Sequence, residues 1–197
     1  MRVTLFLLLA ILLAPVKPVA AAEADEFFEL GLSYLRTAFY ADARAAFAES
    51  LVRAPGQAVP TAFAGIAVAA EGRDSRSCAY LLRLAYERMP ARRSLRLDLR
   101  KVMRSDRDLR LIEKRFTRRM NDKKGRGSRG RGLIDNLTVL AFLQVQDGSP
   151  ETSPALDRLL KTRPADSFAL ALKKLRAPPP KKEKPKKEKD ESKKAKP

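Results

Sequence analysis

Histidine is absent from the 197 residues of this chain, and cysteine occurs once, as Cys78. Without histidine, the chain lacks the side chain that most often acts as a general base or a metal ligand at neutral pH. One cysteine can form neither an internal disulfide nor a zinc site built from several thiolates. Because Cys78 lies in an apolar stretch, we expect a buried and inert thiol.

The chain also has few glycines, nine in all, and no glycine-rich phosphate loop. The glycines between residues 125 and 132 alternate with Arg and Ser and lack the preceding strand that a nucleotide-binding loop requires. Alternation of apolar and polar residues hardly occurs, so we expect helices and no strands. Four acids stand among arginines and are expected to balance charge: Asp98, Asp106, Asp108 and Glu113. We therefore expect no catalysis, no cofactor and no metal site.

A spacing pattern between residues 24 and 57 predicts a pair of packed helices. Its members are Phe27, Leu30, Gly31, Tyr34, Ala43, Phe47, Ser50 and Pro55. The large apolar residues recur three or four apart, which places them on one face of each helix. Gly31 and Ala43 leave room for the neighbouring helix, and Pro55 ends the second helix because proline has no backbone N–H to donate. Such a hairpin leaves one further face for a neighbour to cover.

These residues resemble the signature of tetratricopeptide repeats, which recur about every 34 residues. A second unit, 58–91, follows in register, since Gly65 stands 34 residues after Gly31. Hairpins over 91–121 and 133–166 have the length of a repeat and fewer of its signature residues. The resemblance implies an all-α fold, a right-handed α-solenoid of about four such hairpins, whose first helices line a concave groove. An ordinary helical bundle is the alternative.

Apolar periodicity and turn residues predict nine helices in this fold. Their expected ranges are 23–38, 41–54, 58–71, 75–89, 91–104, 106–120, 132–146, 151–162 and 166–176. Ser105 and Asp166 can cap the helices that follow them by accepting free backbone N–H groups. The last helix is expected to cover the exposed apolar face of the fourth hairpin, because repeat arrays need a capping element.

Residues 1–22 have the pattern of a signal peptide. Arg2 precedes an unbroken apolar run from Leu5 to Leu13, and Ala20–Ala22 supply the small residues that cleavage requires. This run is shorter than the roughly 20 residues that a spanning helix needs. We expect cleavage near Ala22, no transmembrane span in the mature chain, and a location in the periplasm or outside a bacterial cell. An uncleaved membrane anchor is the alternative.

The helical domain is expected to span residues 23–177, with two segments that remain unfolded. Residues 122–132 form a basic loop rich in glycine that has no large apolar residue. Residues 178–197 consist mainly of Pro, Lys and Glu, and they cannot bury enough apolar surface to offset the entropy of ordering. We therefore expect a flexible loop inside the domain and a disordered lysine-rich tail after it.

The net charge of +18 is concentrated in one part of the chain. Residues 92–132 hold seventeen Lys and Arg and five acids, whereas residues 23–91 carry a net charge of −2. The arginines at 93, 96, 100 and 104 recur three or four apart, and like charges on one helical face repel each other. Guanidinium groups bind carboxylate and phosphate with two parallel hydrogen bonds, which favours an anionic partner. A solvated basic face that only maintains solubility is the alternative.

Repeat geometry would place these arginines in the concave groove, beside apolar residues of the first two units. The expected partner-binding residues are Phe28, Leu32, Leu35 and Arg36 in the first unit, and Arg93, Arg96, Arg100 and Arg104 in the third. The second unit would add Ala62, Ile66, Ala69 and Ala70. We therefore expect a non-enzymatic protein–protein interaction scaffold of the bacterial cell envelope or exterior that binds an extended or acidic peptide in this groove.

Two other functions are compatible with the sequence. One is electrostatic binding of anionic polymers or lipid headgroups, such as cell-envelope polysaccharide or nucleic acid. Export argues against genomic DNA, and the basic segment lacks the interleaved aromatic residues that stack on single-stranded bases. The other is an accessory enzyme that uses paired carboxylates. The sequence leaves the oligomeric state open.

Overall fold

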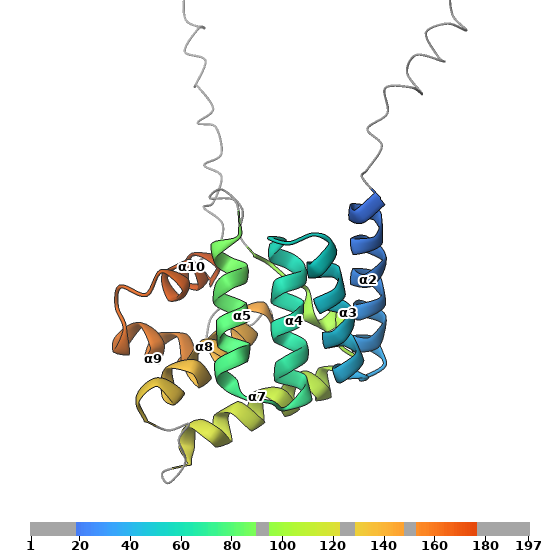
Figure 1. Cartoon of the computed structure of the whole chain (residues 1–197). Coiled ribbons are helices and arrows are strands. Elements are labelled where there is room, and N and C mark those ends of the chain that lie inside the picture. The colour runs from blue at the N-terminus through green and yellow to red at the C-terminus, as the bar shows by residue number, and fades with distance from the viewer. Residues whose placement is uncertain (1–18, 90–94, 123–128, 148–152, 177–197) are drawn as a thin grey trace, which may run out of the picture.

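The structure is a computed structural model that describes residues 19–89, 95–122, 129–147 and 153–176. These residues form nine helices and no strand, so the expected all-α class is confirmed for the described part of the chain. The helices are α2 (Val19–Arg36), α3 (Tyr40–Arg53), α4 (Ala58–Glu71), α5 (Ser75–Glu87), α6 (Leu99–Val102), α7 (Asp106–Asn121), α8 (Gly130–Gln146), α9 (Pro154–Thr162) and α10 (Ser167–Arg176). Figure 1 shows α2 to α5 side by side, with α7 crossing below α4 and α5.

The first hairpin, α2 and α3, is packed as its small residues predict. Gly31 is buried against the ring of Phe47, and a Cβ added to Gly31 would lie 2.5 Å from the nearest ring carbon. Ala43 and Phe47 are completely buried. The second helix of the pair ends at Arg53, two residues before Pro55. The local prediction for this segment is confirmed.

The second hairpin, α4 and α5, repeats this contact. A Cβ added to Gly65 would lie 3.2 Å from Leu82 Cδ2 and 3.3 Å from Leu81 Cβ, so this glycine also permits a close approach of helices. The Cys78 thiol donates to the Gly65 carbonyl at 3.1 Å and is fully buried, and this burial raises its pKa above the ordinary value. The expectation of a buried thiol is confirmed.

Three aromatic rings join the two hairpins. Phe28 of α2, Phe47 of α3 and Phe63 of α4 lie with ring centroids 5.7 to 5.8 Å apart. Aromatic pairs at this separation contribute about 0.5–1.5 kcal/mol beyond the burial of their surface. This cluster fixes α4 against the first hairpin.

Helix α4 is buried on every side. All residues from Pro60 to Ala70 are buried, and the helix packs against α3, α5 and α7. Its sequence is apolar around the whole circumference, which is typical of a central helix. Its last carbonyl groups have no partner within the helix, so partners from elsewhere in the protein can stabilise them.

The helix expected over residues 91–104 is not formed. Residues 95–98 are not helical, and α6 contains only Leu99–Val102. Burial alternates along this stretch: the leucines at 95, 97 and 99 are buried, and the residues between them are exposed. This period of two is that of an extended chain, in which successive side chains point to opposite sides. The prediction of a helix over residues 91–104, and with it the third hairpin, is therefore wrong.

The side chain of Gln146 stabilises the extended stretch. Its Nε2 donates to the Leu95 carbonyl at 2.6 Å, and its Oε1 accepts from the Leu97 amide at 2.8 Å. One buried amide side chain thus satisfies two backbone groups that a helix would have satisfied locally. This contact joins residues about fifty positions apart, which local spacing cannot reveal.

The remaining helices complete the core beside α5. Helix α8 packs against α5, α7 and α9, and α10 packs against α8 and α9 and buries Phe168 and Leu172. The expectation that the last helix covers the hairpin of α8 and α9 is confirmed. Helix α8 begins at Gly130, so residues 130–132 are helical and do not belong to an unfolded loop. Leu133 and Ile134, which follow directly, pack against the core and stabilise this first turn of α8.

Several expectations fall outside the described residues. They concern most of the signal peptide, residues 123–128 of the basic loop, Arg93 and the lysine-rich tail. Ala20–Ala22, where cleavage is expected, lie in the first turn of α2. Among the described helices, none has the length and apolar character that a membrane crossing demands.

Replacing Gly31 with Ala is expected to destabilise the protein. The added methyl group would overlap the Phe47 ring, and overpacking of this kind costs about 1–3 kcal/mol, more than the helix propensity that alanine gains. Urea unfolding should show a free energy of unfolding lower by about 1–2 kcal/mol. The same change in a Phe47→Leu background should cost less, because leucine leaves more room. Equal costs in both backgrounds would contradict the proposed overlap.

Candidate functional site

The apolar part of the expected groove is not open to a partner. Leu32 is 8% exposed and Leu35 is fully buried, and Phe28 is half-buried in the aromatic cluster. The expected residues of the second unit, Ala62, Ile66, Ala69 and Ala70, are buried as well. The chain itself covers this side, since α6 contacts α2 and α7 contacts α4. Only Arg36 of the first-unit residues is exposed.

The expected arginines do not form a single helical face. Arg96, Arg100 and Arg104 are exposed, but they lie in the extended stretch, in α6 and in the turn after it. Arg96 donates to the Leu175 carbonyl near the end of α10 at 3.0 Å. Arg100 forms an ion pair with Asp147, the C-cap of α8, at 2.9 Å. Two of these three arginines are therefore held by the ends of helices.

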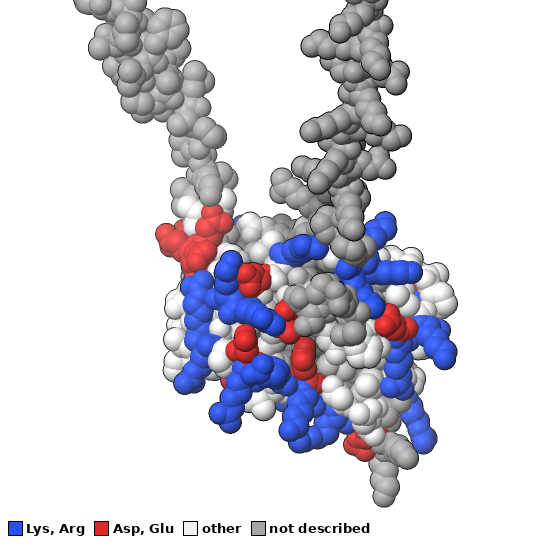
Figure 2. Space-filling model, turned by 180° about the vertical axis from the view of Figure 1, so that it is seen from behind, with Lys and Arg blue, Asp and Glu red and all other residues white. Residues whose placement is uncertain are grey.

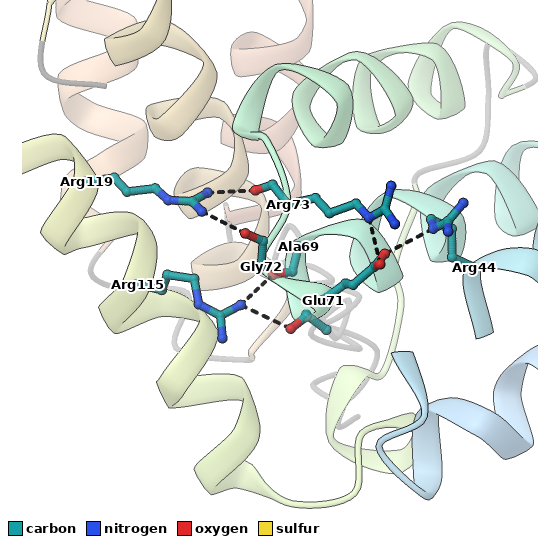
Figure 3. A network of polar contacts seen from close by, with 8 residues as sticks. Arg44, Ala69, Glu71, Gly72, Arg73, Arg115 and Arg119 are labelled. Atoms are coloured by element: carbon teal, nitrogen blue, oxygen red, sulfur yellow. Dashed lines mark hydrogen bonds and ion pairs between the residues drawn. The ribbon is translucent and has the colours of Figure 1, made fainter. Parts of the chain in front are cut away.

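Two arginines of α7 bind the C-terminal end of α4 (Figure 3). Arg115 Nη1 donates to the carbonyls of Ala69 and Ala70 at 3.2 and 3.0 Å. Arg119 donates to the carbonyls of Gly72 and Arg73, both at 2.7 Å. The last carbonyls of a helix lack partners within the helix and carry partial negative charge, so guanidinium groups stabilise them. These four hydrogen bonds hold α7 across the end of α4.

Gly72 makes this contact possible. Its φ of 84° lies in the left-handed region, and its amide and that of Arg73 bond back to carbonyls of α4 in the usual glycine-terminated helix end. A Cβ at this position would lie 2.7 Å from Arg115 Nη1. Glycine is therefore required for both the backbone conformation and the approach of the guanidinium group.

Glu71 balances the charge at the same helix end. It accepts from Arg73 Nε at 2.6 Å and from Arg44 Nε at 3.0 Å (Figure 3). Burial by itself would raise the pKa of Glu71, but the hydrogen bonds from the two arginines outweigh it and lower the pKa. The carboxylate thus stays charged and ties α3 to the turn between α4 and α5.

A third arginine, Arg83 of α5, joins three helices. It forms a two-pronged ion pair with Asp166, at 2.9 and 3.0 Å, and donates to Thr138 Oγ1 of α8 at 2.9 Å. Asp166 also accepts from the Ala169 amide, so the expected N-cap of α10 is confirmed. Burial would raise the pKa of Asp166, but the bonds from Arg83 and from backbone amides lower it.

The outward side of α7 carries cations that have no ion-pair partner among the described residues. We call Arg104, Arg107, Arg110, Lys114 and Arg118 the α7 basic face. At about 100° per residue, the four members within the helix lie opposite the buried Leu109, Ile112 and Phe116. Figure 2 shows Lys and Arg side chains along the lower edge of the molecule, where Figure 1 places α7.

An exposed leucine lies within the α7 basic face. Leu111 is 50% exposed and, with Lys114, Arg118 and Asp122, lines a shallow depression of about 640 Å³. Arg115 and Arg119 form its inner wall. The surface therefore combines an apolar contact with flanking cations, which suits an acidic protein segment that also has an apolar side chain.

Local spacing did not predict the roles of Arg115, Arg119, Arg83 and Gln146. A signal was present for the first two, since they stand four apart on α7, roughly 100° from its outward face. Side chains on such a flank point away from the core, stay at least partly exposed and can reach the end of a neighbouring helix. For Arg83 and Gln146 no local signal exists, because their partners lie about fifty or more positions away.

No protein-family model, no curated protein and no solved structure matches this chain. The kind of protein therefore has to follow from the fold and the surface of the chain. They describe an all-α protein whose outer helix, α7, is fixed by two arginines and presents other cations to solvent.

Replacing Arg115 or Arg119 with Ala is expected to destabilise the fold. Either change removes hydrogen bonds from a charged group to the end of α4, at a cost of about 1–2 kcal/mol for this partly exposed site. Lys114→Ala and Arg118→Ala are the matched controls and should change the free energy of unfolding by less than about 0.5 kcal/mol. Equal effects of all four substitutions in urea unfolding would refute the role of the α4 end.

The Arg83–Asp166 pair is expected to make stability sensitive to acid. The pKa of Asp166 is lower in the folded than in the unfolded chain, so its contribution is complete above about pH 4 and is lost as the pH falls through the folded value. Asp166→Asn should lower the free energy of unfolding by about 1–2 kcal/mol at pH 7 and by less at pH 3. The control is Glu29→Gln, at an exposed site. A difference that stays constant with pH would contradict this assignment.

Proposed function

We propose that this chain is a non-enzymatic interaction scaffold that binds an acidic segment of another protein on the α7 basic face. The single observation that carries the proposal is the row of cations along α7 that have no ion-pair partner in the described ranges, with the exposed Leu111 among them. The proposal keeps the expected acidic partner and moves its site from the concave groove to an outer helix.

The repulsion between these cations supports a partner of opposite charge. Arg110, Lys114 and Arg118 follow one another at intervals of four residues, and like charges at this spacing destabilise a helix by a few tenths of a kcal/mol per pair. Acids at the start of α7, Asp106 and Asp108, offset only its positive N-terminal end. Carboxylates of a partner would relieve the repulsion along the remainder of the helix.

For the fold, the proposal includes two tetratricopeptide-like units, formed by α2 with α3 and by α4 with α5. Gly31 and Gly65, 34 residues apart, support it because each lies against the second helix of its own hairpin. These units are proposed to hold α7 on their inner side. An exported location is part of the same proposal, based on the pattern of residues 1–22.

Binding of anionic polymers or lipid headgroups is the competing function. The exposed Leu111 in the depression favours a protein segment, because a uniform polyanion would not use an apolar side chain. Salt separates the two functions, since binding that rests on charge alone falls steeply with ionic strength.

Binding of an acidic peptide that contains leucine tests the proposal. Fluorescence anisotropy with the full chain should show binding that weakens about tenfold or more in Arg110→Glu/Lys114→Glu/Arg118→Glu. Leu111→Ser should weaken binding of this peptide and leave binding of polyglutamate unchanged.

The matched control is Lys161→Glu/Lys173→Glu/Lys174→Glu, which changes the charge equally at exposed sites on α9 and α10. It should retain nearly full affinity. Equal losses in both triple variants would indicate a general charge effect and favour the polymer. No binding of the leucine-containing peptide would refute the proposal.

A further inference from the structure

A second cleft, separate from α7, lies between α5, α8 and the end of α9. It has a volume of about 1350 Å³ and opens to solvent. Leu81, Leu133 and Ile134 supply apolar walls, and Tyr80 stands beside them with 63% of its surface exposed. The volume exceeds the roughly 300–1,000 Å³ of a small-molecule pocket and suits a segment of polypeptide.

Cations surround this apolar surface. Arg76, Arg131 and Arg163 line the cleft, are exposed and have no ion pair among the residues that the structure describes. They come from three different helices or helix ends, so they surround the cleft and do not form a single charged stripe. Arg83 also lines it, but its guanidinium is engaged by Asp166. Arg76 and Arg131 interact electrostatically with Asp74 and Asp135, but the four arginines that line the cleft outnumber these two acids, which favours an anionic ligand.

Two acids in the cleft restrict which anion fits. Asp74 is satisfied, since it accepts from the amides of Arg76 and Ser77, and these bonds lower its pKa. Asp135 is half-buried and has no hydrogen-bond donor within the described part of the chain, and burial raises its pKa. A ligand that supplies an N–H group would satisfy Asp135. A peptide backbone has such groups, whereas an acyl chain or a polyphosphate has none.

We propose that this cleft binds an extended peptide segment of a partner, in which apolar side chains alternate with acidic ones. Apolar side chains contact Tyr80 and Leu133, carboxylates pair with Arg131 and Arg163, and a backbone N–H donates to Asp135. The chain's own segments outside the described ranges do not have this chemistry. Residues 1–18, 90–94 and 123–128 contain basic residues and no acid, residues 148–152 contain one acid and no large apolar residue, and residues 177–197 contain nine lysines and four acids.

The probe is a peptide of about eight residues that alternates Leu with Asp or Glu and spans roughly 26 Å when extended. Anisotropy measured on the full chain in about 0.3 M NaCl suppresses long-range attraction, because the screening length falls to about 6 Å. Binding should weaken about tenfold or more in Tyr80→Ala/Arg131→Ala/Arg163→Ala. A peptide with glycine in place of leucine should bind at least about tenfold more weakly to the unaltered chain.

The matched control is Phe39→Ala/Lys173→Ala/Lys174→Ala, which removes one exposed aromatic ring and two exposed cations elsewhere. It should bind as the unaltered chain does. The same measurements in the background of the triple Glu variant of the α7 basic face remove the contribution of that face. In this background the cleft substitutions should still weaken the remaining binding about tenfold, which makes the two sites distinguishable. Unchanged binding in the cleft variant would overturn the proposal. Binding to anionic phospholipid vesicles that is lost in the cleft variant, without peptide binding, would overturn it in favour of a lipid.

Discussion

The carbonyl end of α4 is held by two guanidinium groups of α7, and the surface that α7 presents to solvent depends on this contact. Helix α4 is buried from Pro60 to Ala70, and its last carbonyls lack partners within the helix and carry partial negative charge. Arg115 and Arg119 satisfy them and set both the position and the rotation of α7 about its axis. In this orientation the apolar side of α7 faces the core, and its remaining cations point to solvent. The position of the α7 basic face is therefore linked to the contact at the end of α4.

The same chemistry recurs at other helix ends. Arg96 donates to a carbonyl near the end of α10, and Arg100 pairs with the C-cap residue of α8. Arg83 pairs with Asp166, the N-cap of α10. Arginines within the basic part of the sequence therefore divide into those that hold helices together and those that remain available to a partner. The net charge of a segment does not distinguish the two groups. They differ in the distance from the guanidinium group to the nearest carbonyl or carboxylate oxygen.

The position of the extended stretch explains why the apolar groove is not a binding site. Residues 95–98 and α6 lie where a third hairpin was expected, and residues that would have lined the groove belong to the core. Gln146 holds this stretch by two backbone hydrogen bonds. The inner side is thus used for stability, and the surfaces proposed for partners are the outer side of α7 and the cleft beside α5. Both combine exposed apolar side chains with arginines.

Residues close together in the sequence determined the helical class, eight of the nine helices within four residues at either end, the contact of Gly31 with the next helix, and the caps at Ser105 and Asp166. These features depend on spacings of three or four residues and on the backbone properties of glycine and proline, which a sequence displays directly. Tertiary structure alone decided that residues 95–98 are extended and which arginines remain free. Those outcomes depend on partners more than forty positions away, such as Gln146 and the carbonyls of α4, and no local pattern encodes such a distance.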